Sequence, residues 1–271
     1  METRCEMIDL HCHILPGLDD GPGTVEESLA MARMGYGDGI RVVVATPHTL
    51  NGFHHNGRSA ILVKVEEFKQ ALDQYGFRNS DRGIRSKESC DSKHRTPHSS
   101  LRILPGSDVR LCEKTLQELD EGNVLTIGDE GKYLLLEFPT LSVPPQSENL
   151  LAQLLKRGIV PIITHPERNM EIVRKPGRYY EMIRMGCLGQ VTAMSLTGGF
   201  GIEAKRVAEK LLTHKLLHII ASDAHSTNGR PPVLSQAVEA AGKIIGESKA
   251  RKMVIDCPQA VLEGLSFRFT Q

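Results

Sequence analysis

The sequence has no excess of charge of either sign and no long apolar run. Its 271 residues carry 33 basic and 33 acidic side chains, so charge gives no reason to expect nucleic acid or an anionic membrane as a partner. No apolar stretch approaches the roughly 20 residues that a membrane-spanning helix needs, and the opening residues show no signal-peptide pattern. We therefore expect a cytoplasmic protein without a membrane span.

Paired-cysteine motifs are absent as well. The six cysteines stand at irregular spacing, and none belongs to a C-x-x-C motif. This pattern excludes a zinc ribbon and does not resemble a disulfide framework. We predict reduced thiols.

Short apolar runs, several of them rich in β-branched residues, recur along the chain and mostly alternate with segments of helical periodicity. A capping box at Thr24-x-x-Glu27 predicts the start of one helix, and Ser147 predicts the start of another that Gly158 would end. This alternation favours a parallel α/β architecture, and the polar residues directly after the strands favour a barrel over an open sheet. The predicted strands are Met7–Leu10, Val42–Ala45, Leu101–Leu104, Tyr133–Phe138, Val160–Ile163, Leu188–Val191 and Leu217–Ala221.

We interpret residues 1–271 as a single domain with one interruption. The segment Arg78–Ser100 is polar, basic and nearly free of apolar residues. Such a composition is typical of a solvated, partly disordered insertion, although a binding arm is the alternative interpretation.

Side chains with ligand chemistry come at the ends of the predicted strands. The carboxyl ends of the strands in a parallel barrel meet on one face, so these residues are expected to become neighbours. His11 and His13 would point to the same side because side chains along a strand alternate, and Cys12 would then face away as a packed thiol. The candidate ligands are His11, His13, Asp20, His48, Asp108, Glu137, His165, Asp223 and His225.

Each of these residues also has a purely structural interpretation. A single histidine at a strand end is usually a surface or hydrogen-bonded residue, and Asp19–Asp20 before Gly21 is typical of a turn. Five histidines and several carboxylates after six strands make coincidence a poor explanation of the whole set. The remaining loop histidines are expected to have no role in the site, except that His54 or His55 could border it; they are His54, His55, His94 and His98.

The mixture of imidazole and carboxylate ligands indicates a transition-metal site. It suits Mn²⁺, Fe or Zn²⁺ better than Mg²⁺ or Ca²⁺, and no thiolate is needed. Nine candidate ligands exceed the needs of one ion, so we expect a cluster of two or three. Such clusters commonly activate water and hold phosphoryl oxygens.

Several segments together resemble a known family. They are IDLHCHILPGLDDGPGTVEESLAMA, GIRVVVATPH, YLLLEFP, GIVPIITHPERN and HIIASDAHSTNGRPP. From Met7 to Leu265 the chain resembles the bacterial manganese-dependent tyrosine-protein phosphatases of capsule and exopolysaccharide loci, within the polymerase-and-histidinol-phosphatase (PHP) superfamily. The resemblance implies a distorted seven-stranded (β/α) barrel, a trinuclear metal centre and a phosphotyrosine substrate on the tail of a partner tyrosine kinase.

The resemblance also implies roles for individual residues. Arg168 in HPER and Arg230 in NGRP match the arginines that bind phosphate, and a surface ion pair is their alternative role. Asp108 stands in GSD where the family usually has glutamate in G-x-E, so it would bind metal with one methylene less. The ligands implied by matching motifs are His11, His13, Asp20, His48, Glu137, His165, Asp223 and His225.

Three other functions can be compared with this one. A thiol-based phosphatase needs a C-x5-R loop, and no cysteine here has arginine six positions later, so that class is excluded. A sibling phosphatase acting on histidinol phosphate or another small phosphomonoester would use the same metal centre. A metal-binding regulator without turnover is the third alternative, and Asp108 is its motivation.

Overall fold

The computed structural model describes residues 6–76 and 100–266, so the predicted insertion at 78–100 lies outside the described residues apart from Ser100. In these two ranges every paired strand runs parallel to its neighbour. One sheet has the order β1 (Met7–Cys12), β2 (Ile40–Ala45) and β4 (Arg102–Pro105). The other has the order β3 (His48–Thr49), β5 (Asp108–Arg110), β6 (Tyr133–Glu137), β7 (Val160–Thr164), β8 (Leu188–Thr192) and β9 (Ile219–Ala221).

The boundary between the two sheets comes from two short interruptions of strands. The chain passes from β2 to β3 through Pro47, which has no N–H to donate to a neighbour. It passes from β4 to β5 through Gly106, where a Cβ would lie only 2.7 Å from Cγ1 of Val44. The seven predicted strands are all present, and β3 and β5 are additional short strands. Among the described residues the strands form two sheets, so a closed barrel is not confirmed.

Contacts between β1 and the end of β9 connect the outer edges of the two sheets. Cys12 forms an isolated parallel bridge with Ala224. The backbone N–H of His13 donates to the carbonyl of Ala224, and that of Asp223 donates to the carbonyl of His11, both at 2.8 Å. The first and last candidate ligands in the sequence are thereby held side by side.

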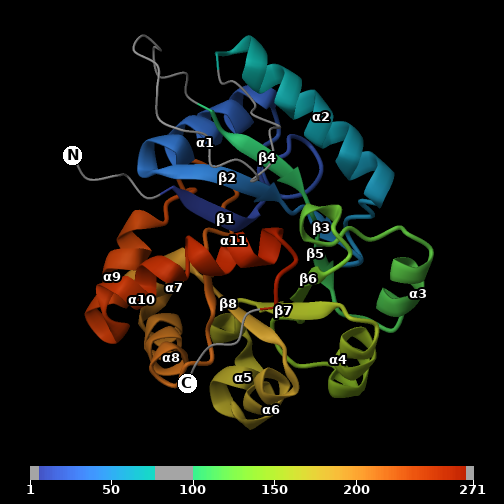
Figure 1. The fold of residues 1–271 in the computed structure, drawn as a ribbon, viewed down its shortest axis with the longest axis vertical. Coiled ribbons are helices and arrows are strands. Elements are labelled where there is room, and N and C mark those ends of the chain that lie inside the picture. The colour runs from blue at the N-terminus through green and yellow to red at the C-terminus, as the bar shows by residue number, and fades with distance from the viewer. Residues whose placement is uncertain (1–5, 77–99, 267–271) are drawn as a thin grey trace.

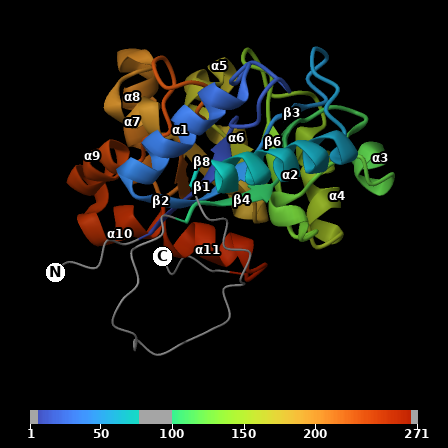
Figure 2. The same cartoon turned by 90° about the horizontal axis from the view of Figure 1, so that it is seen from above.

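Helices lie around the outside of the strands (Figures 1 and 2). No helix in the described ranges is long and apolar enough to cross a membrane. The α-helices are α1 (Val25–Asp38), α2 (Arg58–Gln74), α3 (Thr115–Asp120), α4 (Ser147–Lys156), α5 (Met170–Arg174), α6 (Gly177–Met185), α7 (Ala193–Thr197), α8 (Gly201–Thr213), α9 (Ser235–Ile245), α10 (Glu247–Lys252) and α11 (Asp256–Leu262), and the 3-10 helices are η1 (Ile127–Asp129) and η2 (Pro166–Arg168).

The predicted helix signals are present, with one difference. Thr24 caps α1 and forms the full capping box with Glu27. Helix α4 does begin at Ser147, but its N-cap is Gln146, and the Ser147 hydroxyl donates to the carbonyl of Pro144. The turn at Pro144 uses the hydroxyl that the sequence pattern assigned to capping. Gly158 follows the end of α4 with a φ of +78°, as expected of a residue that ends a helix.

The apolar side chains form two cores. Along β6, Tyr133 and Leu135 belong to an inner core, and Leu134 and Leu136 belong to an outer core that faces the helices. The inner core also contains residues of β1, β2, β7, β8, β9 and α11. Helix α11 therefore covers the amino-terminal ends of the strands. The polar candidate ligands lie at the opposite, carboxyl ends.

Candidate metal centre

His11 and His13 lie at the carboxyl end of β1, and their Nε2 atoms are 3.2 Å apart. Both side chains are buried. Cys12 between them belongs to the outer core, as predicted, and burial raises the pKa of its thiol well above the usual value. The pairing of β1 with β2 shifts register between Asp9 and Cys12. This shift allows the two imidazoles to face the interior although Leu10 before them also belongs to the inner core.

The candidate ligands form three overlapping groups. In each group, one ligand atom per residue lies within 4.8 Å of the ligand atoms of the other members. Because His13, His48 and Asp108 each belong to two groups, the groups are contiguous, and the two oxygens of the Asp108 carboxylate suit it to bridge adjacent ions. The groups are His13, Asp20, His48 and His225; His11, His13 and Asp108; and His48, Asp108 and Glu137.

His165 and Asp223 complete the set. Nε2 of His165 lies 3.5 Å from Oε1 of Glu137. Oδ1 of Asp223 lies 3.4 Å from Nε2 of His11 and 3.5 Å from Nε2 of His13. Both residues have positive φ, 33° for His165 and 52° for Asp223, which is uncommon outside glycine and is often retained at functional sites. The structure therefore brings all nine predicted ligands together.

Asp108 provides the test of whether these residues fit a metal. Its carboxylate is fully buried, and neither oxygen has a hydrogen-bond donor among the described residues. Its Oδ2 lies 3.1 Å from Nδ1 of His48, an ion-pair distance without hydrogen-bond geometry. Since burying a charge without such partners is costly, the donor set fits bound cations at Asp108.

The crowding of ionisable groups displaces their pKa values in opposite directions. Burial disfavours charge on His13, but Asp19 and Asp223 outweigh it and raise the pKa of His13 to about 10. Burial, together with Arg168, lowers the pKa of His165 to about 3. Burial and the neighbouring Asp108 raise the pKa of Glu137 to about 7. These opposed shifts in one small volume are typical of a functional site.

Two residues that orient the imidazoles were not predicted. Oδ2 of Asp19 lies 2.6 Å from Nδ1 of His13 and also accepts from the backbone N–H of His48. Oε1 of Gln190 lies 2.9 Å from Nδ1 of His11. Asp19 was not predicted because the Asp19–Asp20 pair before Gly21 is typical of a turn. The second was detectable as the one amide side chain in the predicted strand Leu188–Val191.

Arg168 and Arg230 converge on one atom. Nη1 of Arg168 donates to Oδ2 of Asp223 at 2.6 Å, and Nη2 of Arg230 forms an ion pair with the same oxygen at 2.5 Å. The shared carboxylate is only 2% exposed, whereas each arginine is about a quarter exposed. Their ion pairs are therefore made with a buried group of the centre, while the arginines themselves remain partly exposed.

The other histidines separate into three cases. The ring of His54 stacks on that of His48, with centroids 6.2 Å apart, so His54 borders the centre. His55 is exposed and its backbone bridges to Thr49. His94 and His98 lie outside the described residues.

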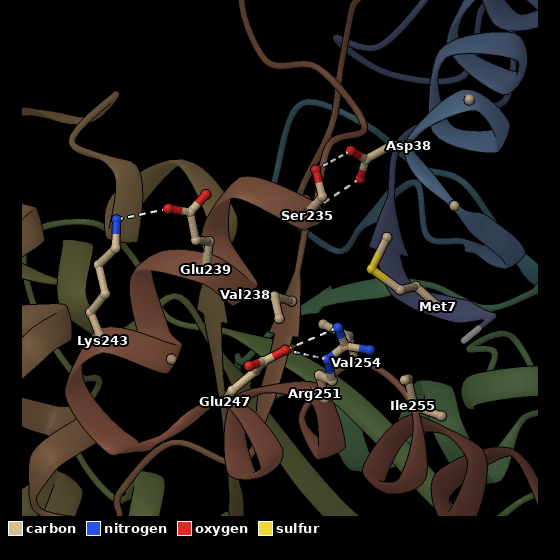
Figure 3. A pocket seen from close by; sticks show the side chains of 13 residues that line it. Met7, Asp38, Ser235, Val238, Glu239, Lys243, Glu247, Arg251, Val254 and Ile255 are labelled. Atoms are coloured by element: carbon tan, nitrogen blue, oxygen red, sulfur yellow. Dashed lines mark hydrogen bonds and ion pairs between the residues drawn. The ribbon is translucent and has the colours of Figure 1, made fainter. Parts of the chain in front are cut away.

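A hollow of about 840 Å³ lies elsewhere, between α1, α9 and α10 (Figure 3). Met7, at the start of β1, lines it, so the hollow lies toward the amino-terminal ends of the strands. Four of its charged side chains form ion pairs, Glu239 with Lys243 and Glu247 with Arg251, and Asp38 accepts hydrogen bonds from Ser235. None of the predicted ligands lines this hollow. Ligand chemistry, rather than the size of a cavity, locates the candidate site.

Comparison with known proteins agrees with this geometry. The family model for capsular polysaccharide synthesis, CpsB/CapC, matches residues 7–80 and 76–263. Tyrosine-protein phosphatase YwqE of Bacillus subtilis is 37% identical over 224 residues, which cover 83% of this chain and 79% of YwqE. Tyrosine-protein phosphatase CpsB of Streptococcus pneumoniae is 30% identical over 261 residues, covering 94% and 98%.

A solved structure is also similar along nearly the whole chain. It comes from a study of YwqE from Bacillus subtilis and CpsB from Streptococcus pneumoniae, described as unique metal-dependent tyrosine phosphatases. Its TM-score is 0.85 at 31% identity, covering 97% of this chain and 96% of the other. The chain therefore belongs to the CpsB/CapC family of capsular polysaccharide synthesis proteins.

Proposed function

We propose that this protein is a metal-dependent tyrosine-protein phosphatase that dephosphorylates the tail of a partner tyrosine kinase and so regulates capsule or exopolysaccharide synthesis. The observation that carries the proposal is the arrangement of three overlapping ligand groups beside two arginines that share Asp223. Relatives named as tyrosine-protein phosphatases support the substrate class.

In this proposal two or three ions, with Mn²⁺ expected and Fe or Zn²⁺ as alternatives, are held by nine residues. Such ions supply Lewis acidity, which makes water a better nucleophile near neutral pH. Asp108, whose buried carboxylate has no hydrogen-bond donor among the described residues, is one of these ligands and would reach the metal with one methylene less than the glutamate that the family resemblance implies. The ligands are His11, His13, Asp20, His48, Asp108, Glu137, His165, Asp223 and His225.

The chain's own contribution to the reaction is to bind and orient phosphate. Arg168 and Arg230 offer planar guanidinium groups, which pair bidentately with phosphoryl oxygens. Water attacks phosphorus, the bond from phosphorus to the tyrosine oxygen breaks, and the phenolate takes up a proton from solvent. Because a phenol has a pKa of about 10, it leaves with less need for a general acid than an alkyl alcohol does.

We also infer a single domain over residues 1–271 and a distorted seven-stranded barrel made by the two sheets together. The inner core shared by strands of both sheets and the bridge between Cys12 and Ala224 support the barrel. We propose a cytoplasmic location, which the free cysteines support; in the described residues they are Cys12, Cys112, Cys187 and Cys257.

Hydrolysis of a phosphotyrosine peptide and of histidinol phosphate, each with added Mn²⁺, tests the function. We expect a much higher kcat/KM on the peptide and no turnover after chelation. Preference for histidinol phosphate would indicate the small-molecule phosphatase instead. Metal binding without turnover of either substrate would indicate a regulator.

A further inference from the structure

Phe200 lies in a turn between α7 and α8 whose sequence is TGGFG. Gly198 and Gly201 flank it with φ of +91° each, a conformation that favours glycine. A Cβ on Gly199 would lie 2.5 Å from Cε of Met194. A residue with a side chain would therefore strain the backbone at Gly198 and Gly201, whereas at Gly199 the flexible end of Met194 would have to move. Phe200 is the one large side chain among these five residues.

The ring of Phe200 contacts both arginines of the candidate site. The guanidinium carbon of Arg168 lies 4.3 Å from the ring centroid, and that of Arg230 lies 5.8 Å from it. Both distances are within the roughly 6 Å over which an aromatic face attracts a cation. The two arginines thus share an aromatic ring as well as Oδ2 of Asp223.

The ring of Phe200 offsets two unfavourable contributions to the free energy of holding Arg168 and Arg230 together. Two guanidinium groups directed at one oxygen repel each other, and the negative face of the ring offsets part of that repulsion. Each arginine is also a long, partly exposed side chain that loses rotamer freedom when it is fixed. A rigid ring beneath it reduces the number of alternative positions.

We propose that Phe200 is a positioning residue that holds Arg168 and Arg230 in the orientation that receives a phosphoryl group. The inference rests on the proposed function for its substrate, but the contacts with the arginines stand independently of it. An aliphatic side chain would fill the same space without an aromatic face, so the aromatic ring is the property that matters.

The test compares Phe200→Leu with Phe200→Tyr in the manganese-loaded protein. We expect Phe200→Leu to weaken the binding of inorganic phosphate about tenfold and to lower kcat/KM on a phosphotyrosine peptide at least as much, because the contribution of a partly desolvated cation–π pair is lost. Phe200→Tyr keeps the aromatic face and should remain within about threefold of the wild type. Metal content and thermal stability serve as checks that both variants are folded.

Ile202→Ala is the matched control. Ile202 lies two residues away at the start of α8, and its side chain is 81% exposed. We expect the Ile202→Ala variant to bind inorganic phosphate with the affinity of the wild type.

A second comparison separates an action through the arginines from a direct contact with substrate. In an Arg168→Ala, Arg230→Ala background, Phe200→Leu should cause no further loss of phosphate or peptide binding. A further loss there, wild-type phosphate binding by Phe200→Leu, or equal impairment by Phe200→Tyr would each overturn the proposal. If the wild type binds phosphate yet hydrolyses no phosphotyrosine peptide, the proposed function fails, and phosphate binding still decides the role of Phe200.

Discussion

In two of the imidazoles of the centre, those of His11 and His13, one ring nitrogen faces the other candidate ligands and the second nitrogen contacts a supporting side chain. Asp19 contacts His13 in this way, and Gln190 contacts His11. Such partners fix the tautomer and the orientation of a metal-binding histidine and raise its basicity when they are acidic. At the scale of single residues, the geometry of the site depends on these supporting groups as well as on the ligands.

Replacing Asp19 with asparagine tests that support. We expect Asp19→Asn to weaken Mn²⁺ binding by about 10–100-fold, because the charge behind His13 is lost while the ligands stay in place. Titration of the metal-free protein with Mn²⁺ measures the change. Asp129→Asn is the control, since Asp129 pairs with Arg58 away from the centre. Equal affinities of Asp19→Asn and the wild type would contradict a role for Asp19.

Replacing Arg230 tests the binding of the phosphoryl group. Arg230→Ala should lower kcat on a phosphotyrosine peptide by about 10²–10³-fold, the loss typical of one preorganised electrostatic donor. Metal content should be unchanged, because no candidate ligand is removed and Arg168 still pairs with Asp223. Arg230→Lys should recover only part of the rate, since a point charge cannot contact phosphate bidentately. Full activity of Arg230→Ala with metal in place would show that Arg230 does not bind substrate.

The sequence allowed the clustering of the candidate ligands to be predicted but not the contacts that support them. His11 and His13 were predictable as a pair because alternation along a strand is a local rule. Asp19 was not, because its sequence context is equally typical of a turn. Phe200 has no titratable group and gave no signal, since its contacts depend on the packing of loops far apart in the chain.

Among the elements, β8 and β9 are joined by His218. The backbone N–H of His218 donates to the carbonyl of Gly189, and the N–H of Gly189 donates to Nδ1 of His218. Burial lowers the pKa of His218 to about 4. The junction between the strands is therefore built around a neutral imidazole.

This neutral imidazole makes stability depend on pH. An unfolded chain gives histidine a pKa of about 6.5, so between pH 6.5 and 4 only the unfolded state binds the proton. The contribution of His218 is complete above pH 6.5 and decreases as the pH falls toward 4. From pH 7.5 to 5 we expect the free energy of unfolding of the metal-free wild type to fall by about 2 kcal/mol more than that of His218→Asn.

Urea unfolding at the two pH values measures this difference. Asparagine at position 218 keeps an acceptor for the N–H of Gly189 but does not titrate. His214→Asn is the control, because His214 is exposed at the end of α8. An identical pH dependence of the wild type and His218→Asn would show that His218 is protonated alike in both states.

The start of α1 offers a second test at this scale. Thr24→Ala removes the side-chain acceptor of the capping box and should lower the free energy of unfolding by about 1 kcal/mol. Urea unfolding at pH 7.5 measures it. Thr213→Ala, at the exposed end of α8, is expected to change stability by less than about 0.5 kcal/mol. A neutral effect of Thr24→Ala would mean that water satisfies the end of α1 equally well.

The positions of the elements could be predicted better than their pairing. Runs such as Val160–Ile163 are recognisable because a buried parallel strand is apolar on both faces. The interruptions at Pro47 and Gly106 divide the strands between two sheets. Their effect could not be foreseen, because it depends on how closely β2 approaches β4.

For the whole molecule, the main question is how many cations the candidate centre binds. Nine ligands in overlapping groups exceed the requirement of one ion, so we expect at least two transition-metal ions per chain in protein purified without chelator. Elemental analysis measures this number. One ion or fewer after reconstitution with Mn²⁺ would contradict the cluster.

Asp223 connects the binding of cations to the binding of anions. One of its oxygens faces His11 and His13, and the other forms ion pairs with Arg168 and Arg230. A cation bound to this carboxylate withdraws negative charge from it and so weakens its ion pairs with the two arginines. Conversely, an anion bound to the arginines weakens the same ion pairs and so makes the carboxylate a better ligand for a cation. Affinities for the two kinds of ion then rise together, by the same factor in either order of addition. The protein would assemble its loaded site cooperatively, with a single aspartate as the thermodynamic link.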